Sequence, residues 1–223
     1  MKKEILNLGA FAFIMFATSC AHKYYTANNI DQYNIKTIAV LPVAMEYTGN
    51  MPKNMTAADL AKKGETESAM FQRSLHNNIL MFMNKKKNPS NVQFQSTSKT
   101  VQILASNNIS ISTSWTEDPV KLAKILGVDA VVKANITTNR YMSDAASGAF
   151  SVLNDVLGSV KGNIPIGNAP TKTGDIIATC TLIENKDGNT IWNIKYDEET
   201  DWRNQPQEII DQITRNFGKR FPL

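Results

Sequence analysis

The sequence predicts an α/β protein: a single α/β sandwich domain with a mixed sheet, preceded by a cleaved lipoprotein signal peptide. Three observations predict this fold class. Apolar, β-branched runs at residues 36–43, 128–138 and 175–184 alternate with stretches whose apolar side chains recur at helical spacing. Residues 185–188, Asn-Lys-Asp-Gly, form a turn signal after the last of these runs, so part of the sheet is antiparallel. Residues 1–20 have the composition of a secretory signal that ends in a cysteine.

The composition disfavours several classes of protein. The chain has 223 residues, 42% of them apolar, which suffices for a real core in one domain. The formal charge of +4 arises from 24 basic and 20 acidic residues, a surplus too small for a dedicated nucleic-acid binder. The two cysteines and two histidines lie far apart and do not supply a four-ligand zinc site. Multi-span membrane, disordered and disulfide-stapled classes are disfavoured as well.

The N-terminal segment predicts secretion and lipid attachment. Two lysines precede an apolar run over residues 5–18, which is shorter than the about 20 residues of a permanent membrane helix. The run ends in Ala-Thr-Ser-Cys at residues 17–20, which resembles the lipobox of bacterial lipoproteins. That resemblance implies that residues 1–19 are a signal peptide and that Cys20 becomes the first mature residue, carrying acyl chains such as palmitate. An ordinary signal peptide with a chance cysteine is the alternative.

Acylation of Cys20 would fix the mature chain to a membrane, because two or three acyl chains hold stably where one does not. By analogy with lipoprotein sorting, Ala21 is not the aspartate that retains lipoproteins at the inner membrane of enterobacteria. We therefore expect the periplasmic face of the outer membrane. Residues 20–35 are polar and rich in asparagine, and we expect them to form the lipidated N-terminus and a tether that reaches at most about 50 Å.

The α/β domain is predicted to cover residues 36–223. In its first half, apolar β-branched residues indicate strands and apolar residues at spacings of one to four indicate a long amphipathic helix. The predicted elements are, in order, a buried strand at residues 36–43, a loop to about residue 54, a helix over residues 66–84 with an extra turn at 56–63, a strand at residues 92–95 and a helix at residues 99–105.

The second half of the domain has clearer boundaries. Asp118 places an N-cap before Pro119, and Gly127 ends the helix between them. Val131 and Val132 are apolar on both faces, which indicates a central strand. The other predicted elements are strands at residues 128–138, about 175–184 and 190–196, and a helix that begins at Pro206 with an apolar stripe of Ile209, Ile210, Ile213 and Phe217.

An insertion at about residues 142–172 separates two of the long strands. Residues 145–160 are small and apolar, and glycines and prolines follow them. Residues 150–157 do not alternate in polarity, which counts against a membrane-spanning β-hairpin. We expect its helix-spaced apolar side chains to form a candidate interaction surface for a partner, a neighbouring copy or the bilayer; a helix packed on its own domain is the alternative. These side chains are Phe150, Leu153, Val156, Leu157 and Val160.

Other chemically distinctive residues have structural explanations. Cys180 shares a strand face with apolar neighbours, so we expect a small buried hydrophobe and not a reactive thiol. We expect Trp192 and Tyr196 to pack under the last helix, with a binding face as the alternative. We expect the acidic cluster at residues 197–201 to form a solvated loop, and His76 to lie on a helix without binding a ligand.

The basic residues Lys85, Lys86 and Lys87 follow the first long helix and suit its negative end. We expect an ordinary basic loop there. Contact with anionic lipid headgroups is the alternative.

Three segments in order resemble a known envelope module: Ile-Ala-Val-Leu-Pro at residues 38–42, Leu-Gly-Val-Asp-Ala-Val-Val at 126–132, and residues 182–192, which end in Asp-Gly-Asn-Thr-Ile-Trp. The module is similar to that of the Tol-system propeller protein's N-terminal domain, the penicillin-binding-protein activator lipoprotein and the curli secretion lipoprotein. It is also similar to uncharacterised lipoproteins of this type. The resemblance implies the α/β architecture and a protein that docks or assembles in the envelope, and it brings no catalytic residues.

No enzyme motif is present: G-x-S-x-G, H-E-x-x-H, a P-loop and C-x-x-C are all absent. We therefore expect no catalysis, cofactor, metal site, nucleic acid or small-molecule substrate. The predicted function is that of an outer-membrane-anchored periplasmic lipoprotein, a non-catalytic binding or assembly module in the cell envelope. Its expected partners are the membrane, through the lipid on Cys20, and an envelope protein or a second copy. The alternative is an oligomeric component of a curli-type outer-membrane secretion channel.

Overall fold

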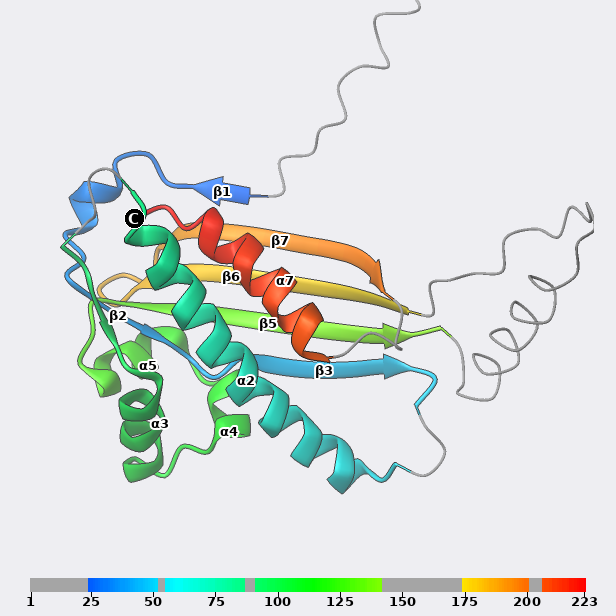
Figure 1. The fold of residues 1–223 in the computed structure, drawn as a ribbon. Helices are drawn as coiled ribbons and strands as arrows, with labels where there is room; N and C mark the ends of the chain where they lie inside the picture. Colours follow the sequence, from blue (N-terminus) through cyan, green and yellow to red (C-terminus); the bar gives the residue numbers. More distant parts are fainter. Residues whose placement is uncertain (1–23, 52–54, 87–90, 142–173, 201–205) are drawn as a thin grey trace, which may run out of the picture.

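A seven-stranded mixed sheet carries helices on both faces, which confirms the predicted α/β fold class (Figure 1). The computed structural model describes residues 24–51, 55–86, 91–141, 174–200 and 206–223. The elements are β1 (Tyr24–Thr26), the 3₁₀ helix η2 (Ile30–Tyr33), β2 (Thr37–Val40), β3 (Ala44–Gly49), α2 (Ala57–Met83), β4 (Gln93–Gln95), α3 (Thr97–Ser106), α4 (Ile111–Thr116), α5 (Pro119–Leu126), β5 (Ala130–Arg140), β6 (Gly174–Glu184), β7 (Thr190–Thr200) and α7 (Pro206–Lys219).

Strand β5 is central, as the apolar pair Val131–Val132 predicts. The strand order is β1-β7-β6-β5-β2-β4, and β3 pairs with β5 beyond the end of β2. β2 and β3 both run parallel to β5, whereas β6, β7 and β1 are antiparallel to their neighbours. β2 and β3 thus follow one another along the same side of β5 and are interrupted at Pro42, whose nitrogen has no hydrogen to donate, while β4 pairs with the outer side of β2. The prediction of a loop from residue 44 to 49 is wrong, because β3 forms there through pairing with a strand about 90 positions later in the chain.

Helices α2 and α7 pack side by side on one face of the sheet and run in the same direction (Figure 1). Thr56 and Asp59 form a reciprocal capping box that starts α2, so residues 57–83 make one continuous helix. Beneath the two helices lies the larger core, to which every second residue of the long strands contributes. It includes the fully buried Trp192, Ile194, Ile213 and Phe217.

A smaller core lies on the opposite face, under α3 and α5. Ala39, Leu41 and Val131 point to this side, where they meet Leu104 and Leu122. Asp118 caps α5 as predicted, and Gly127 ends it with φ +67°. The short helix α4 between them follows no apolar period and was not expected from the sequence.

The segment before the domain is part of the fold, contrary to the predicted tether over residues 20–35. β1 adds to the edge of β7, with Tyr24 opposite Ile194 and Thr26 opposite Trp192. Ala27 is buried, and its N–H donates to the carbonyl of Ile191 at 2.8 Å. Tertiary contacts of this kind are not visible in a local polar sequence. The first described strand therefore begins at residue 24, four positions after Cys20 in the sequence.

Candidate functional site

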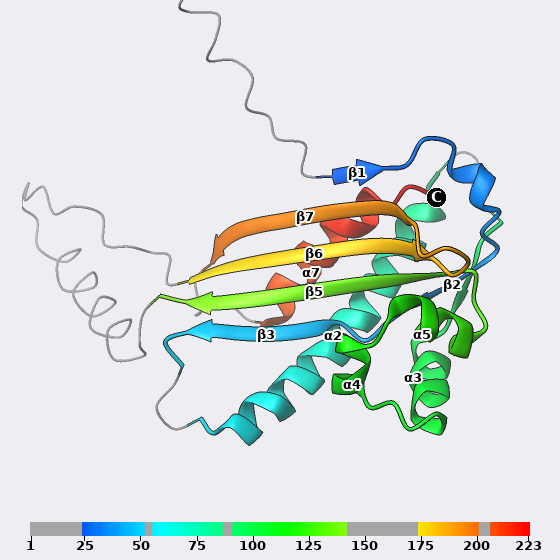
Figure 2. The same ribbon diagram turned by 180° about the vertical axis from the view of Figure 1, so that it is seen from behind.

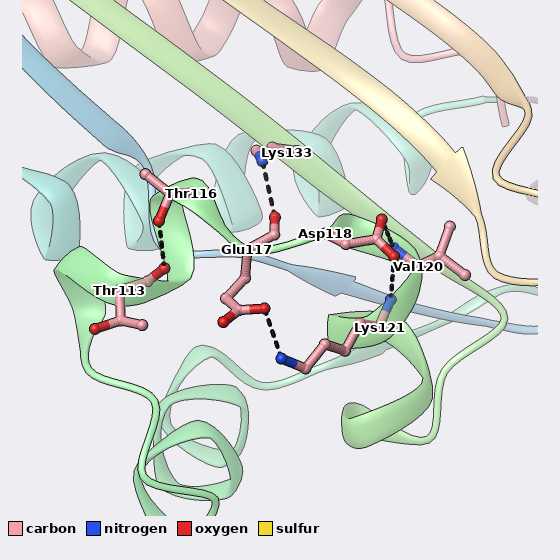
Figure 3. A network of polar contacts seen from close by, with 7 residues as sticks. All are labelled: Thr113, Thr116, Glu117, Asp118, Val120, Lys121 and Lys133. Carbon is pink, nitrogen blue, oxygen red and sulfur yellow. Dashed lines mark hydrogen bonds and ion pairs between the residues drawn. The ribbon is translucent and has the colours of Figure 1, made fainter.

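One face of the sheet is only half covered by helices. α4 and α5 cover one end of this face, and at their border Lys133 Nζ of β5 donates to the main-chain oxygen of Glu117 at 3.2 Å (Figure 3). The same corner is held by the Lys121–Glu117 ion pair at 2.8 Å and by the Asp118 carboxylate, which accepts from the N–H of Val120. Beyond this corner none of the described helices covers β3, β5, β6 and β7 when the molecule is seen from behind (Figure 2).

We call this bare region the open face. Cross-strand register places its side chains in four rows, because directly paired residues of neighbouring strands share a face. Its members are half-buried or exposed, and all but two are polar. They are Ala44, Glu46 and Thr48 of β3, Asn135, Thr137 and Asn139 of β5, Asp175, Ile177, Thr179 and Thr181 of β6, and Asn193, Lys195, Asp197 and Glu199 of β7.

Side-chain hydrogen bonds order the open face. Thr137 Oγ1 donates to Glu46 Oε2 at 3.1 Å across β5 and β3. Asn193 Nδ2 donates to Thr181 Oγ1 at 2.8 Å across β7 and β6. Along β7, Lys195 and Asp197 form an exposed ion pair at 3.0 Å. These bonds hold donors and acceptors in fixed places on a flat surface, which reduces the entropy that a partner's binding would cost.

One end of the open face is acidic and bears an exposed tyrosine. Asp175, Asp197 and Glu199 lie in its last two rows. Tyr141, 48% exposed, follows β5 at this end. The pKa of the Tyr141 phenol is raised, first by loss of hydration and then by the nearby charges of these carboxylates and a hydrogen bond to Asp175. The prediction that the acidic residues lie on a loop is wrong for 197–199, because β7 continues to residue 200; Asp201 lies outside the described residues.

A groove of about 700 Å³ lies on the other side of the sheet, along the first half of α2. Beside it Tyr47 Oη donates to Glu67 Oε2 at 2.6 Å, and Lys63 pairs with Glu67 at 3.6 Å and lies over the tyrosine ring. Burial, and then the Glu67 carboxylate, raise the pKa of Tyr47, so its phenol stays protonated and serves to position β3 against α2. The groove is lined by Asp59, Lys62, Lys63, Thr66, Glu67, Met70 and Gln207.

Two other carboxylates with shifted pKa values have structural partners. Asp129 Oδ2 accepts from the N–H groups of Lys36 and Thr37 at 3.0 and 2.9 Å, and thereby joins β2 to β5. Burial raises the pKa of Asp129, but these bonds outweigh it and hold the pKa below its usual value. Glu184 closes the β6–β7 hairpin by accepting from the N–H groups of Lys186 and Asp187, both at 2.7 Å. Neither carboxylate is left for acid–base chemistry.

Most residues singled out in the sequence that the structure describes lie in the core. Cys180 and Trp192 are fully buried, as predicted, and Tyr196 is buried beside α7. Burial raises the pKa of the Cys180 thiol. His76 is half-buried on α2 with its ring against Phe94 at 6.0 Å. Among the described residues no three or more His, Cys, Asp and Glu side chains gather as metal ligands.

Lys86 has a structural partner, which was not predicted. Its Nζ donates to the main-chain oxygens of Phe221 at 3.1 Å and Leu223 at 2.5 Å, and so joins the end of α2 to the C-terminus. Lys85 Nζ lies 5.6 Å from the centre of the Phe82 ring, and Lys87 lies outside the described residues.

Both residue sets predicted as functional lie outside the described residues: Cys20, and the insertion with Phe150, Leu153, Val156, Leu157 and Val160. No helix in the described ranges is long and apolar enough to cross a membrane. The open face was not predicted. Its signal in the sequence is the alternation of Asn135, Thr137 and Asn139 with Ala134 and Ile136 along β5.

Comparisons with known proteins give distant similarities. No protein-family model matches the chain, and no curated protein matches its sequence. Among solved structures, the LpoB C-terminal domain from Salmonella enterica is 11% identical, with 74% of this chain and 83% of that one covered and a TM-score of 0.35. A PelC dodecamer from Paraburkholderia phytofirmans is 8% identical, with 88% and 92% covered and a TM-score of 0.39. Lipoprotein GNA1162 from Neisseria meningitidis is 12% identical, with 83% and 99% covered and a TM-score of 0.36. Function is therefore inferred from the residues of this chain.

Proposed function

We propose that this chain is a lipid-anchored, non-catalytic protein of the outer membrane's periplasmic face, and that it binds an envelope protein through the open face. The observation that carries the proposal is the ordered polar surface on β3, β5, β6 and β7, which the helices of the described ranges leave uncovered. The anchor rests on the lipobox-like segment that ends at Cys20.

The size of the open face suits a reversible protein contact. Four strands about 4.8 Å apart and four rows about 6.8 Å apart make a flat patch of about 500 Å². A standard stable interface buries about 800 Å² on each partner, and weak or transient contacts bury less. The open face therefore supports a weak contact on its own, or a stable one if the partner also reaches the flanks.

The chemistry of the open face favours a protein over a small molecule. Its groups are dispersed in rows and do not converge on a concave pocket, which small ligands require. Threonine and asparagine side chains both donate and accept hydrogen bonds. The charges comprise one lysine, Lys195, and four carboxylates, so a partner with basic side chains is favoured at the acidic end.

Crosslinking in intact envelopes tests the proposed contact. Thr179 lies in the middle of the open face, between Asn135 and Lys195 in the cross-strand pairing. Thr179→Arg places an unmatched charge inside the contact and should weaken it by about thirtyfold or more, the equivalent of about 2 kcal/mol. Thr66→Arg is the matched control, since Thr66 is exposed on α2.

The expected result is a crosslinked complex that the wild-type and Thr66→Arg chains form and the Thr179→Arg chain does not. Loss of the complex with Thr66→Arg alone would assign binding to the α2 groove and contradict the proposal. A chain that is monomeric in native-mass measurements and free of crosslinks contradicts it as well.

A separate measurement tests the anchor. Radiolabelled palmitate should enter the wild-type protein and not Cys20→Ala, because Cys180 is buried and offers no second site. A mature N-terminus at any residue other than Cys20 would refute the lipid anchor and leave the open-face proposal untouched.

A further inference from the structure

We propose that the β1 edge of the sheet, together with the C-terminal end of α7, rests on the phospholipid headgroups of the membrane that holds the anchor. We call this surface the membrane edge and define it as Tyr24, Tyr25, Lys219 and Arg220. The inference rests on the proposed lipid attachment at Cys20. It assigns to the domain an orientation on the membrane.

The distance from the anchor to the fold is short. β1 begins at Tyr24, so three residues separate it from Cys20. Fully extended, this stretch spans at most about 14 Å. Electrostatic attraction to a charged surface acts over about 8–10 Å at physiological salt. An acylated Cys20 therefore holds the β1 edge within, or just beyond, the range at which headgroups attract cations.

The side chains of β1 suit a membrane–water interface. Tyr24 is paired with Ile194 and projects on the α7 side, whereas Tyr25 is paired with Asn193 and projects on the open-face side. They are 49% and 54% exposed, and with Tyr141 they are the exposed large hydrophobic residues of the described chain. Tyrosine is enriched where membranes meet water, because its ring is apolar and its hydroxyl is polar.

The last turn of α7, with Lys219 and the following Arg220, is linked to the β1 edge. In both ribbon views this end of the helix is drawn next to β1 (Figures 1 and 2). Phe221 packs on Trp192, which is paired with Thr26, so the last turn is tied to the same edge. Lys219 and Arg220 are exposed, and neither forms an ion pair with a described residue. Arg220 Nη1 donates to Asn216 Oδ1 at 2.9 Å, a neutral acceptor that does not offset the guanidinium charge.

The opposite edge of the molecule also carries exposed cationic side chains, but they lie far from β1. Lys99 on α3 and Lys124 on α5 are exposed. Helices α3, α4 and α5 lie on the far side from β1 in both views. They therefore provide internal controls for a footprinting experiment.

The test supplies the anchor chemically. The unacylated mature chain, from Cys20 onward, is coupled through the Cys20 thiol to maleimide lipids in vesicles that contain phosphatidylglycerol. Cys180 does not compete, since it is fully buried. Acetylation of exposed lysines is then compared with the same chain capped by a soluble maleimide.

Two cations near an anionic surface at about 1 kcal/mol each favour the docked state by about thirtyfold. We expect acetylation of Lys219 to slow by up to this factor on the vesicles, and that of Lys99 and Lys124 to change by less than about twofold. Equal rates for Lys219 and Lys99 would overturn the inference.

A charge-neutral variant separates the membrane edge from general crowding at the vesicle surface. Lys219→Gln with Arg220→Gln should restore oxidative labelling of Tyr24 and Tyr25 to the rate of the uncoupled chain. Lys99→Gln with Lys124→Gln should leave their protection intact. Both variants change exposed side chains, and circular dichroism checks their fold.

The possible outcomes distinguish a failure of the proposed membrane edge from a failure of the proposed lipid anchor. Unacylated Cys20 in cells would refute the anchor, while vesicle coupling still reports whether the edge docks. Acylated Cys20 with no protection of Lys219 on vesicles would refute the membrane edge alone. Protection of Lys219 in envelopes but not on vesicles would assign the edge to a protein and also overturn the inference.

Discussion

The crossing of α2 and α7 places Gly218 directly against the backbone of α2, and this contact yields a sharp prediction. A Cβ at residue 218 would lie 2.8 Å from the carbonyl carbon and oxygen of Asn78 and 3.0 Å from the nitrogen of Ile79. The two helices are also joined there by the Asn78 Nδ2–Thr214 Oγ1 hydrogen bond at 2.9 Å. Gly218→Ala therefore requires the helices to move apart.

The cost of that movement follows from packing. Overpacking of a well-packed interior costs about 1–3 kcal/mol. Alanine regains at most about 1 kcal/mol of helix propensity, and less near the last turn, where residue 218 lies. We expect a net loss of about 1–2 kcal/mol in the free energy of unfolding, or a Tm lower by roughly 3–6 °C for a domain of this size.

Gly64 provides the matched control within α2. A Cβ there would meet Trp115 Cη2 at 3.4 Å and Tyr47 Cε2 at 3.6 Å, which are ordinary contacts. Gly64→Ala should therefore gain about 1 kcal/mol from helix propensity. The same substitution thus has opposite effects at the two glycines. Thermal and urea unfolding of the mature chain, followed by circular dichroism, measures both; a stabilising Gly218→Ala would refute the close crossing.

Three further predictions concern the hairpin, the thiol and the C-terminus. Burial raises the pKa of Glu184, but hydrogen bonds from the Asn189, Lys186 and Asp187 backbone outweigh it and hold the pKa below 4.5. The ionised Glu184 therefore contributes to the free energy of unfolding above pH 4.5, and this contribution is lost as the pH falls through the lowered pKa. Glu184→Gln should lower the free energy of unfolding by about 1–3 kcal/mol at pH 7 and remove this part of its pH dependence, as measured by urea titrations. In a Cys20→Ala chain, Cys180 should react with a thiol reagent at pH 8 only after guanidinium is added, and a fast reaction of the folded chain would contradict its burial. Lys86→Met should make the C-terminus more sensitive to carboxypeptidase, and an unchanged digestion rate would show that the bonds of Lys86 do not hold it.

Local sequence patterns predicted the second half of the fold well, because its boundaries depend on neighbouring residues. Asp118 starts α5 by accepting hydrogen bonds from backbone N–H groups of its first turn, and Gly127 ends the helix with a positive φ. The β6–β7 hairpin likewise depends on the turn at 185–188. The elements that were missed are β1, η2, β3 and α4, of which the two strands form through pairing with partners far along the chain.

The open face was only partly visible in the sequence. The alternation of Asn193 and Lys195 with Trp192 and Ile194 in the sequence indicates that one side of β7 is polar. Whether helices cover that side depends on how far α4 and α5 reach across β5, which no local pattern encodes. The lipid on Cys20 and the interaction surface at 142–172 lie outside the described residues and stay predictions.

Photocrosslinking from single positions tests the proposed binding function most directly. A photoreactive phenylalanine analogue is placed at Thr179 on the open face, and at Thr66 on α2 as the control, in the full chain within intact envelopes. The open-face proposal predicts a light-dependent adduct of one defined mass from position 179 and none from position 66. Adducts from position 66 alone, or from neither position, would contradict it.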